Sequence, residues 1–144
     1  IEGGMLSYQA DMTAANNPYE LGLDRLVDLD MEADFIGKAA LRSIQQSGVK
    51  QRQVGLILNG AALSGPNTAY WPLRAGDQVV GQITSAVYSP RLEQNIALAM
   101  VANNYSVLGT QLEADLSNEV REVTVVEKPF FDPKKAIAAS TQPA

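Results

Sequence analysis

The stretch QVVGQITSAVYSP, residues 78–90, is a long run of residues that favour β-structure. Its internal glycine, Gly81, predicts a bulge or a bend, because a glycine inside a strand pattern usually marks one of the two. Ser89–Pro90 ends the run, since proline has no backbone N–H to donate to a sheet. The stretch therefore predicts one long strand that bends partway along its length.

Shorter runs with a period of two surround this strand. RQVGLILNG at 52–60 is typical of a strand, and the alternating apolar residues of 112–116 and 123–125 predict a hairpin about Ser117–Asn118. NIALAMVA at 95–102 is compatible with a helix by propensity, whereas the strands around it favour a strand. Five or six strands without intervening helices predict an antiparallel β-barrel or a jelly-roll-like module.

The first third of the chain mixes loops with helices. Asn17–Pro18 predicts a helix start, because Asn caps helices and Pro suits the first helical position. Asp34 can cap a second helix over residues 35–46, and Ser47–Gly48 would end it. This second helix would carry one apolar stripe, formed by Ile36, Ala40 and Ile44.

The sequence therefore predicts an α+β chain in three parts. Residues 1–48 form a mixed loop and helical segment, residues 49–135 form the antiparallel β-barrel, and residues 136–144 are a small, polar tail that we expect to be disordered.

Composition limits the chemistry of this chain. It contains neither Cys nor His, which excludes disulfides, thiolate or His-ligated metal sites and Ser–His–Asp catalysis within it. Its net charge of −5 is unlike that of a nucleic-acid-binding protein, and no apolar run approaches the ~18 residues that span a membrane. We expect no metal, no nucleic acid and no membrane partner, and a cytoplasmic location, with which the lack of Cys is compatible.

Spacing alone favours structural roles for most of the polar residues. Carboxylates such as Glu2 and Asp11 in a Gly-rich segment usually bond to nearby backbone, although they could also orient a ligand. Tyr8 could stack on a flat ring, but large aromatic residues more often pack. Lys128 and Arg91 could bind an anionic group, while bases on a barrel surface are usually solvated. Residues and spacing alone do not define an active site.

A set of motifs in sequence order goes further. Residues 1–41 contain, in turn, E-x-G, Y-x-x-D, a Pro-led E-x-G-L and F-I-G-K-x-x-L, which fall on Glu2–Gly4, Tyr8–Asp11, Pro18–Leu23 and Phe35–Leu41. VGLIL, GQITSAVYSPRLEQNIALAMV and KPFFDP follow. Together they resemble the C-terminal half of the folate-dependent aminomethyltransferase family, which includes the T protein of the glycine cleavage system. The likeness extends from Ile1 to about Lys135.

The resemblance implies a tetrahydrofolate cofactor and the transfer of a one-carbon unit, aminomethyl or methyl, to it. Residues 1–48 would be the C-terminal remnant of a folate-binding domain. Glu2, Tyr8 and Asp11 would support the wall of the folate channel, and Lys128 and Phe131 would lie where the anionic glutamyl tail leaves it. No catalytic residue is assigned, because the catalytic carboxylates of the family lie in the part of the protein that precedes the position of Ile1.

The same resemblance suggests a partner and leaves the donor open. In the family an Arg directly precedes the E-x-G step, so we hypothesise that this chain is a C-terminal fragment whose partner is the preceding polypeptide. NNPYELGL departs from the T-P-x-E-A-G-L of T proteins and is nearer to the dimethylsulfoniopropionate-demethylase-like branch. The one-carbon donor is a small molecule of unidentified class. The alternatives are a non-catalytic folate-binding protein, whose K-G-C-Y-x-G-Q-E motif is absent, and a β-barrel interaction module.

Overall fold

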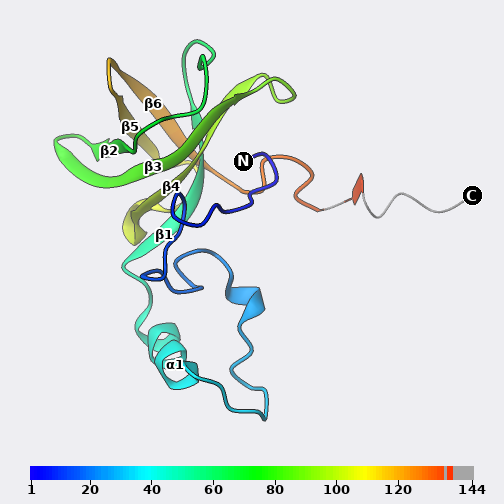
Figure 1. Cartoon of the computed structure of the whole chain (residues 1–144). Helices are drawn as coiled ribbons and strands as arrows, with labels where there is room; N and C mark the ends of the chain where they lie inside the picture. The colour runs from blue at the N-terminus through cyan, green and yellow to red at the C-terminus, as the bar shows by residue number, and fades with distance from the viewer. Residues whose placement is uncertain (135, 138–144) are drawn as a thin grey trace, which may run out of the picture.

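Six strands close into an antiparallel barrel in the computed structural model, which describes residues 1–134, 136 and 137 (Figure 1). Around the barrel the order is β1-β4-β3-β2-β5-β6, and β6 pairs back with β1. This arrangement confirms the predicted barrel. The strands are β1 (Gln51–Leu58), β2 (Trp71–Ala75), β3 (Gln78–Ser89), β4 (Gln94–Ala102), β5 (Gln111–Leu116) and β6 (Glu119–Val126).

Strand β4 is buried on both faces, which explains why its sequence is also compatible with a helix. Ala97, Ala99 and Val101 belong to the barrel core. Ile96 and Leu98 alternate with them and are also fully buried. Figure 1 shows the N-terminal segment running across β3 and β4. A strand covered on both faces has a continuous apolar run instead of an alternating one.

Two bulges bend β3, and the first lies beside Gly81, where the sequence predicts a bulge or a bend. Leu73 of β2 pairs with Gly81 but Arg74 pairs with Val79, so one residue of β3 has no partner on β2. A Cβ at Gly81 would lie only 2.3 Å from the carbonyl oxygen of Met100, so β4 crosses too closely for any side chain. The second bulge leaves Thr84 without a partner on β4.

The helices of the first third are shorter than predicted. Helix α1 covers Lys38–Ser47, so the prediction that a helix begins at Phe35 is wrong. Gly37 occupies the N-cap position at φ 95°, while the Asp34 carboxylate accepts only from the adjacent Phe35 N–H, 3.0 Å away. The expected apolar stripe is also poorly covered in the described chain, since Ala40 is exposed and Ile44 is only partly buried. Ile36 is fully exposed and no residue of α1 is buried.

The predicted helix start at Asn17–Pro18 forms one turn and no helix. Asn17 Oδ1 accepts from Glu20 N–H (3.0 Å) and Glu20 Oε2 accepts from Asn17 N–H (3.4 Å), which is the reciprocal capping that starts a helix. The turn ends at Gly22, whose φ is +69°. A 3-10 helix, η1 (Asp24–Leu26), follows after one residue.

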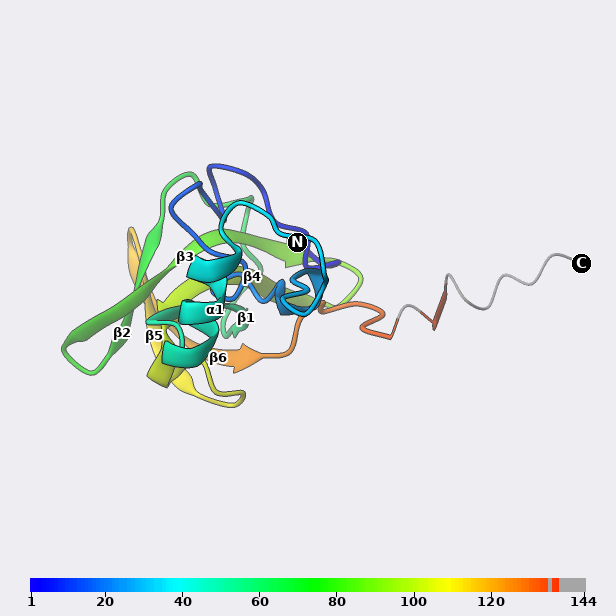
Figure 2. The ribbon, with the colours of Figure 1, turned by 90° about the horizontal axis from the view of Figure 1, so that it is seen from below.

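The N-terminal segment and the segment after β6 lie on the same side of the barrel, while α1 projects from one end of it (Figures 1 and 2). The chain has a further 3-10 helix, η2 (Asn103–Tyr105), after β4. No helix among the described residues is long and apolar enough to cross a membrane. Apart from Ala136 and Ile137, the tail predicted at 136–144 falls outside the described residues.

We expect Gly81→Ala to destabilise the barrel by about 3 kcal/mol, because the new Cβ would overlap the backbone of β4. Gly65→Ala is the matched control, since a Cβ there meets nothing within 4 Å. Urea unfolding followed by circular dichroism would compare the two variants with the parent protein. Equal midpoints for both variants would contradict the close crossing.

Candidate functional site

The predicted residues Glu2 and Phe131 meet beside the end of β3. Phe131 N–H donates to the Glu2 backbone oxygen at 3.1 Å, and the Arg91 guanidinium lies 4.3 Å from the centre of the Phe131 ring. The Glu2 carboxylate accepts from the hydroxyl of Ser89, which is buried, and its second oxygen is 3.9 Å from Arg91 Nε. Glu2 therefore fastens the start of the chain to β3 and to the segment after β6.

Asp11 is a buried carboxylate, 4% exposed, that joins the N-terminal segment to the second bulge of β3. Its Oδ2 accepts from Ser7 N–H at 2.9 Å, and its Oδ1 accepts from Thr84 Oγ1 at 2.6 Å. Thr84 Oγ1 also lies 3.1 Å from the Leu98 carbonyl oxygen, although it has one hydrogen to share between the two. The bulge turns Thr84 toward the carboxylate.

Lys128 is a partly buried cation that Gln53 holds in place. Its ammonium donates to Gln53 Oε1. Burial lowers the pKa of Lys128 from 10.5 to about 8, the Asp11 carboxylate opposes this shift, and Arg52 adds to it. Since the folded pKa lies below the unfolded one, the charged form destabilises the fold below about pH 8, and this cost falls as the pH rises from 8 to 10.5.

The other end of the Gln53 amide is a hydrogen-bond donor without a partner. Gln53 is 3% exposed, and its Nε2 has no hydrogen bond in the part of the chain that the structure describes. A buried donor of this kind is costly unless something accepts from it. Lys128, which the Gln53 side chain positions, is therefore the group at this place that suits an anion.

Lys128 opens into a pocket of about 470 Å³ between the N-terminal segment and the residues after β6. Gly4 lies close against Pro129 in the wall of this pocket. It has φ +66°, and a Cβ there would lie 3.3 Å from Pro129 Cα, so this position favours glycine. The other lining residues are Gly3, Met5, Leu6, Met12, Gly22, Leu23, Arg25 and Pro129. The wall is thus mostly apolar, with positive charge at Lys128 and Arg25, as pockets for organic ligands are.

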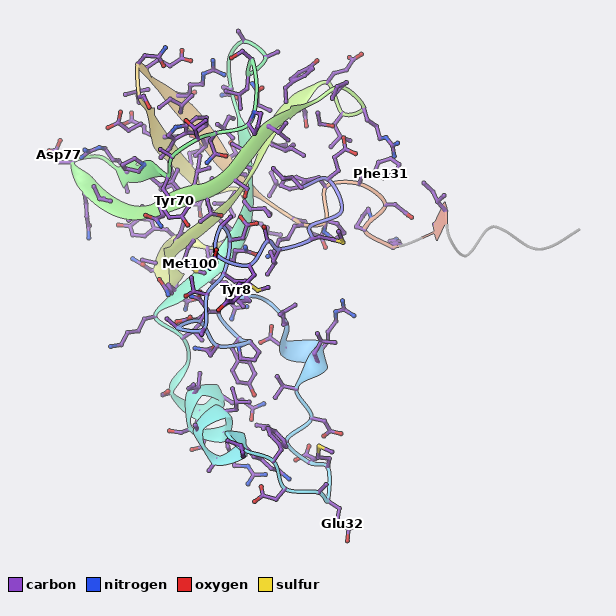
Figure 3. The ribbon with its side chains drawn as sticks, viewed as in Figure 1. Tyr8, Glu32, Tyr70, Asp77, Met100 and Phe131 are labelled. Atoms are coloured by element: carbon purple, nitrogen blue, oxygen red, sulfur yellow. The ribbon has the colours of Figure 1, made fainter. Side chains whose placement is uncertain are left out.

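Tyr8 lies apart from the other predicted residues. It is 62% exposed and lines a separate groove of about 550 Å³ together with Tyr70. Figure 3 shows Tyr8 below Tyr70 and well away from Phe131. The Tyr70 hydroxyl lies 2.9 Å from the Gln9 carbonyl oxygen and 3.0 Å from that of Ala10, and so binds the loop that carries Tyr8.

The five predicted residues therefore fall into three places: Glu2 with Phe131, Asp11 near Lys128, and Tyr8 alone. Sequence reasoning missed Gln53 as a site residue. The signal for Gln53 was weak, since the only hint was a polar side chain within an apolar strand. In the described chain no group of three or more His, Cys, Asp or Glu side chains could hold a metal ion.

Residues 51–132 match the glycine cleavage T-protein C-terminal barrel domain. This match covers more than half of the chain and all six strands of the barrel, and it includes Gln53 and Lys128. The chain belongs to this family. The result agrees with the resemblance seen in the sequence motifs.

Two relatives with named activities are similar to this chain over most of its length. It is 40% identical to an aminomethyltransferase of Synechococcus sp. (strain CC9902) over 131 residues, which is 91% of the chain and 35% of the relative. It is 39% identical to the dimethylsulfoniopropionate demethylase DmdA of Ruegeria pomeroyi over 127 residues, 88% of the chain and 34% of the relative. The chain is about equally similar to both and spans about a third of each.

A solved structure has the same fold. The glycine cleavage system aminomethyltransferase T of Bartonella henselae superposes with a TM-score of 0.80 at 24% identity, covering 91% of this chain and 36% of that one. The family match spans only residues 51–132, whereas the superposition covers 91% of the chain. The superposition therefore includes N-terminal residues as well as the barrel.

We expect Thr84→Val to destabilise the protein by about 2 kcal/mol, because Asp11 would lose its buried hydroxyl donor. Thr124→Val is the matched control, since Thr124 lies on β6 and its side chain has no hydrogen-bond partner among the described residues. Denaturant unfolding near pH 7 measures both. Equal stabilities of the two variants would show that the bond between Asp11 and Thr84 contributes nothing.

Proposed function

We propose that this chain forms one wall and the lid of a tetrahydrofolate pocket in a one-carbon transferase similar to the aminomethyltransferases. The observation that carries the proposal is Lys128, a partly buried cation that Gln53 positions in the wall of an open pocket. A partly buried cation that opens into a pocket suits a carboxylate, and the glutamyl tail of folate carries carboxylates. The largely apolar pocket of about 470 Å³ beside Lys128 suits a ring system.

The residues present fit this cofactor. Lys128, positioned by Gln53, would hold the tail, while Glu2 and Asp11 would keep the wall in place through Ser89 and Thr84. Phe131 would lie at the exit with Arg91 above its ring. Tyr8 would either contact the cofactor from the neighbouring groove or support the part of the wall that the Tyr70 hydroxyl holds in place. Bound tetrahydrofolate supplies N5, which accepts the one-carbon unit.

The chemistry of transfer depends mainly on positioning, with a carboxylate that stabilises positive charge on the donor. We assign this carboxylate to polypeptide that precedes Ile1, because the chain covers about a third of the relatives' length. Residues 1–48 would then be the end of the folate-binding domain, and 49–135 the barrel domain that closes it. The exposed Ile36 and the unburied helix α1 would pack against the preceding part. We place the reaction in the cytoplasm.

We expect the whole protein to bind 5-formyl-tetrahydrofolate, and Lys128→Gln to weaken the binding about tenfold, because one charged hydrogen bond is lost. Affinity of the unaltered protein should also decline as the pH rises through about 8, where Lys128 loses its charge, and Lys128→Gln should remove this dependence. Lys134→Gln is the control, since Lys134 is exposed. Isothermal titration measures all three proteins, and an identical affinity for both variants would contradict the assignment.

Single-turnover transfer separates a transferase from a protein that only binds folate. The whole protein, mixed with tetrahydrofolate and a donor, should convert the cofactor to its methylene or methyl form within one turnover. An aminomethyl group, a sulfonium compound, a methyl ether and a methylamine cover the candidate donors. Tight folate binding with no transfer from any of the four would favour the non-catalytic alternative, and no folate binding would favour an interaction module.

A further inference from the structure

The segment that carries Lys128 leaves the barrel before it reaches that residue. Pairing between β6 and β1 ends at Val126 and Gly55. Residues 127–130, which follow, make no backbone hydrogen bond with any described residue. The position of Lys128 relative to β1 therefore depends on side-chain contacts of this segment.

The Phe130 ring lies on β1 at Gly55. A Cβ at Gly55 would be 3.0 Å from Phe130 Cζ and 3.1 Å from its Cε1, so the ring takes the space that a side chain of β1 would occupy. A glycine inside a strand often marks such a close approach. The neighbouring Pro129 lies against Gly4 of the N-terminal segment, whereas Phe130 lies against the barrel.

Lys128 and Phe130 contact the same face of β1. Gln53 and Gly55 are two residues apart on the strand, so both point outward from the same face. Gln53 accepts from the Lys128 ammonium, and Gly55 receives the Phe130 ring. The Lys128 side chain has no other hydrogen bond in the described chain, and one bond at the tip of a flexible four-carbon stem does not fix its base. The contact two residues further on holds the lysine backbone against β1.

We propose that Phe130 is a positioning residue of the candidate cofactor site, whose ring, seated on Gly55, sets how deeply Lys128 lies in the wall of the pocket. This inference rests on the proposed function of that pocket. Phe130 acts through Lys128, because a lysine that is already ordered and correctly directed loses less freedom when it meets a carboxylate. The same contact maintains the burial that lowers the pKa of Lys128.

Phe130→Ala should raise the pKa of Lys128 from about 8 toward its usual 10.5 in the whole protein without folate, because the lysine would become less buried. The charged groups that face Lys128 are Asp11 of the N-terminal segment, Arg52 of β1 and Arg25 across the pocket. All three are unchanged in the variant, so the shift reports burial. NMR titration of ¹³C-labelled lysine measures it.

Phe131→Ala is the matched control for this titration. It removes the adjacent ring, which lies under Arg91, and leaves the ring on Gly55 in place. The Lys128 titration should therefore stay where it is. An unchanged titration in Phe130→Ala, or equal shifts in the two variants, would overturn the inference.

Gly55→Ala tests the same contact from the barrel side and remains informative if Phe130→Ala fails to fold. The new methyl group would displace the ring from β1, so the pKa of Lys128 should rise here too. Leucine lacks the two ring atoms that the methyl group would meet, so adding Phe130→Leu should return the titration toward that of the parent protein. The Val126 carbonyl oxygen is also only 3.2 Å from this Cβ position. No recovery in the double variant would assign the effect to β6 and overturn the role of Phe130.

Affinity shows whether the position of Lys128 matters to the cofactor. Phe130→Ala should weaken binding of 5-formyl-tetrahydrofolate about fivefold at pH 7, because Lys128 would first have to be ordered. The decline of affinity expected above about pH 8 should move to higher pH. Weaker binding with an unmoved pH profile would indicate a merely structural role and overturn the inference. No binding by the parent protein would contradict the proposed function instead, and the titration without folate would still decide the role of Phe130.

Discussion

The hydrogen bond between Asp11 and Thr84 is the interaction on which the arrangement of this chain most depends. It joins two residues 73 positions apart, is buried, and lies at a bulge of the longest strand. Asp11 cannot be removed from water cheaply, so it remains buried only while Thr84 and Ser7 donate to it. This requirement fixes where the N-terminal segment crosses the barrel, and through that crossing it buries the outer face of β4.

The same carboxylate also sets the charge of the candidate cofactor site. Lys128 loses solvation where the segment after β6 packs against β1, and without a nearby anion its pKa would fall further. Asp11 therefore helps to keep a cation in the wall near neutral pH, while Gln53 fixes the direction of its ammonium. One buried acid thus serves both the attachment of the segment and the electrostatics of the pocket. The proposed anion site therefore lies where the N-terminal segment meets the barrel.

The barrel followed from the sequence, because alternation and turn residues are local signals. The bulge at Gly81 was also predictable, since a glycine within a strand usually marks a bulge, a bend or a close approach of another backbone. The helices of the first third were predicted less well. The capping hydrogen bonds at Asn17 form, but Gly22 ends that turn with a positive φ. Gly37 takes the N-cap position that was expected for Asp34, and no residue of α1 is buried among the described residues. Helix length depends on tertiary packing as well as on caps.

The site was only partly predictable for a similar reason. Resemblance in the motifs pointed to Asp11, Lys128, Glu2 and Phe131, and the structure brings these together in two pairs. It could not point to Gln53, whose role depends on the register that places β1 beside Lys128. It also could not show that Tyr8 faces a different groove, because the direction of an exposed side chain depends on the path of the loop.

The claim that Lys128 binds the anionic end of a folate is tested most directly by NMR of the whole protein with ¹³C-labelled lysine. The Lys128 Cε signal, titrated with and without 5-formyl-tetrahydrofolate, should report a pKa near 8 that rises when the carboxylate binds, because an adjacent anion favours the ammonium. An unchanged Lys128 titration at a saturating concentration of the ligand would contradict the account.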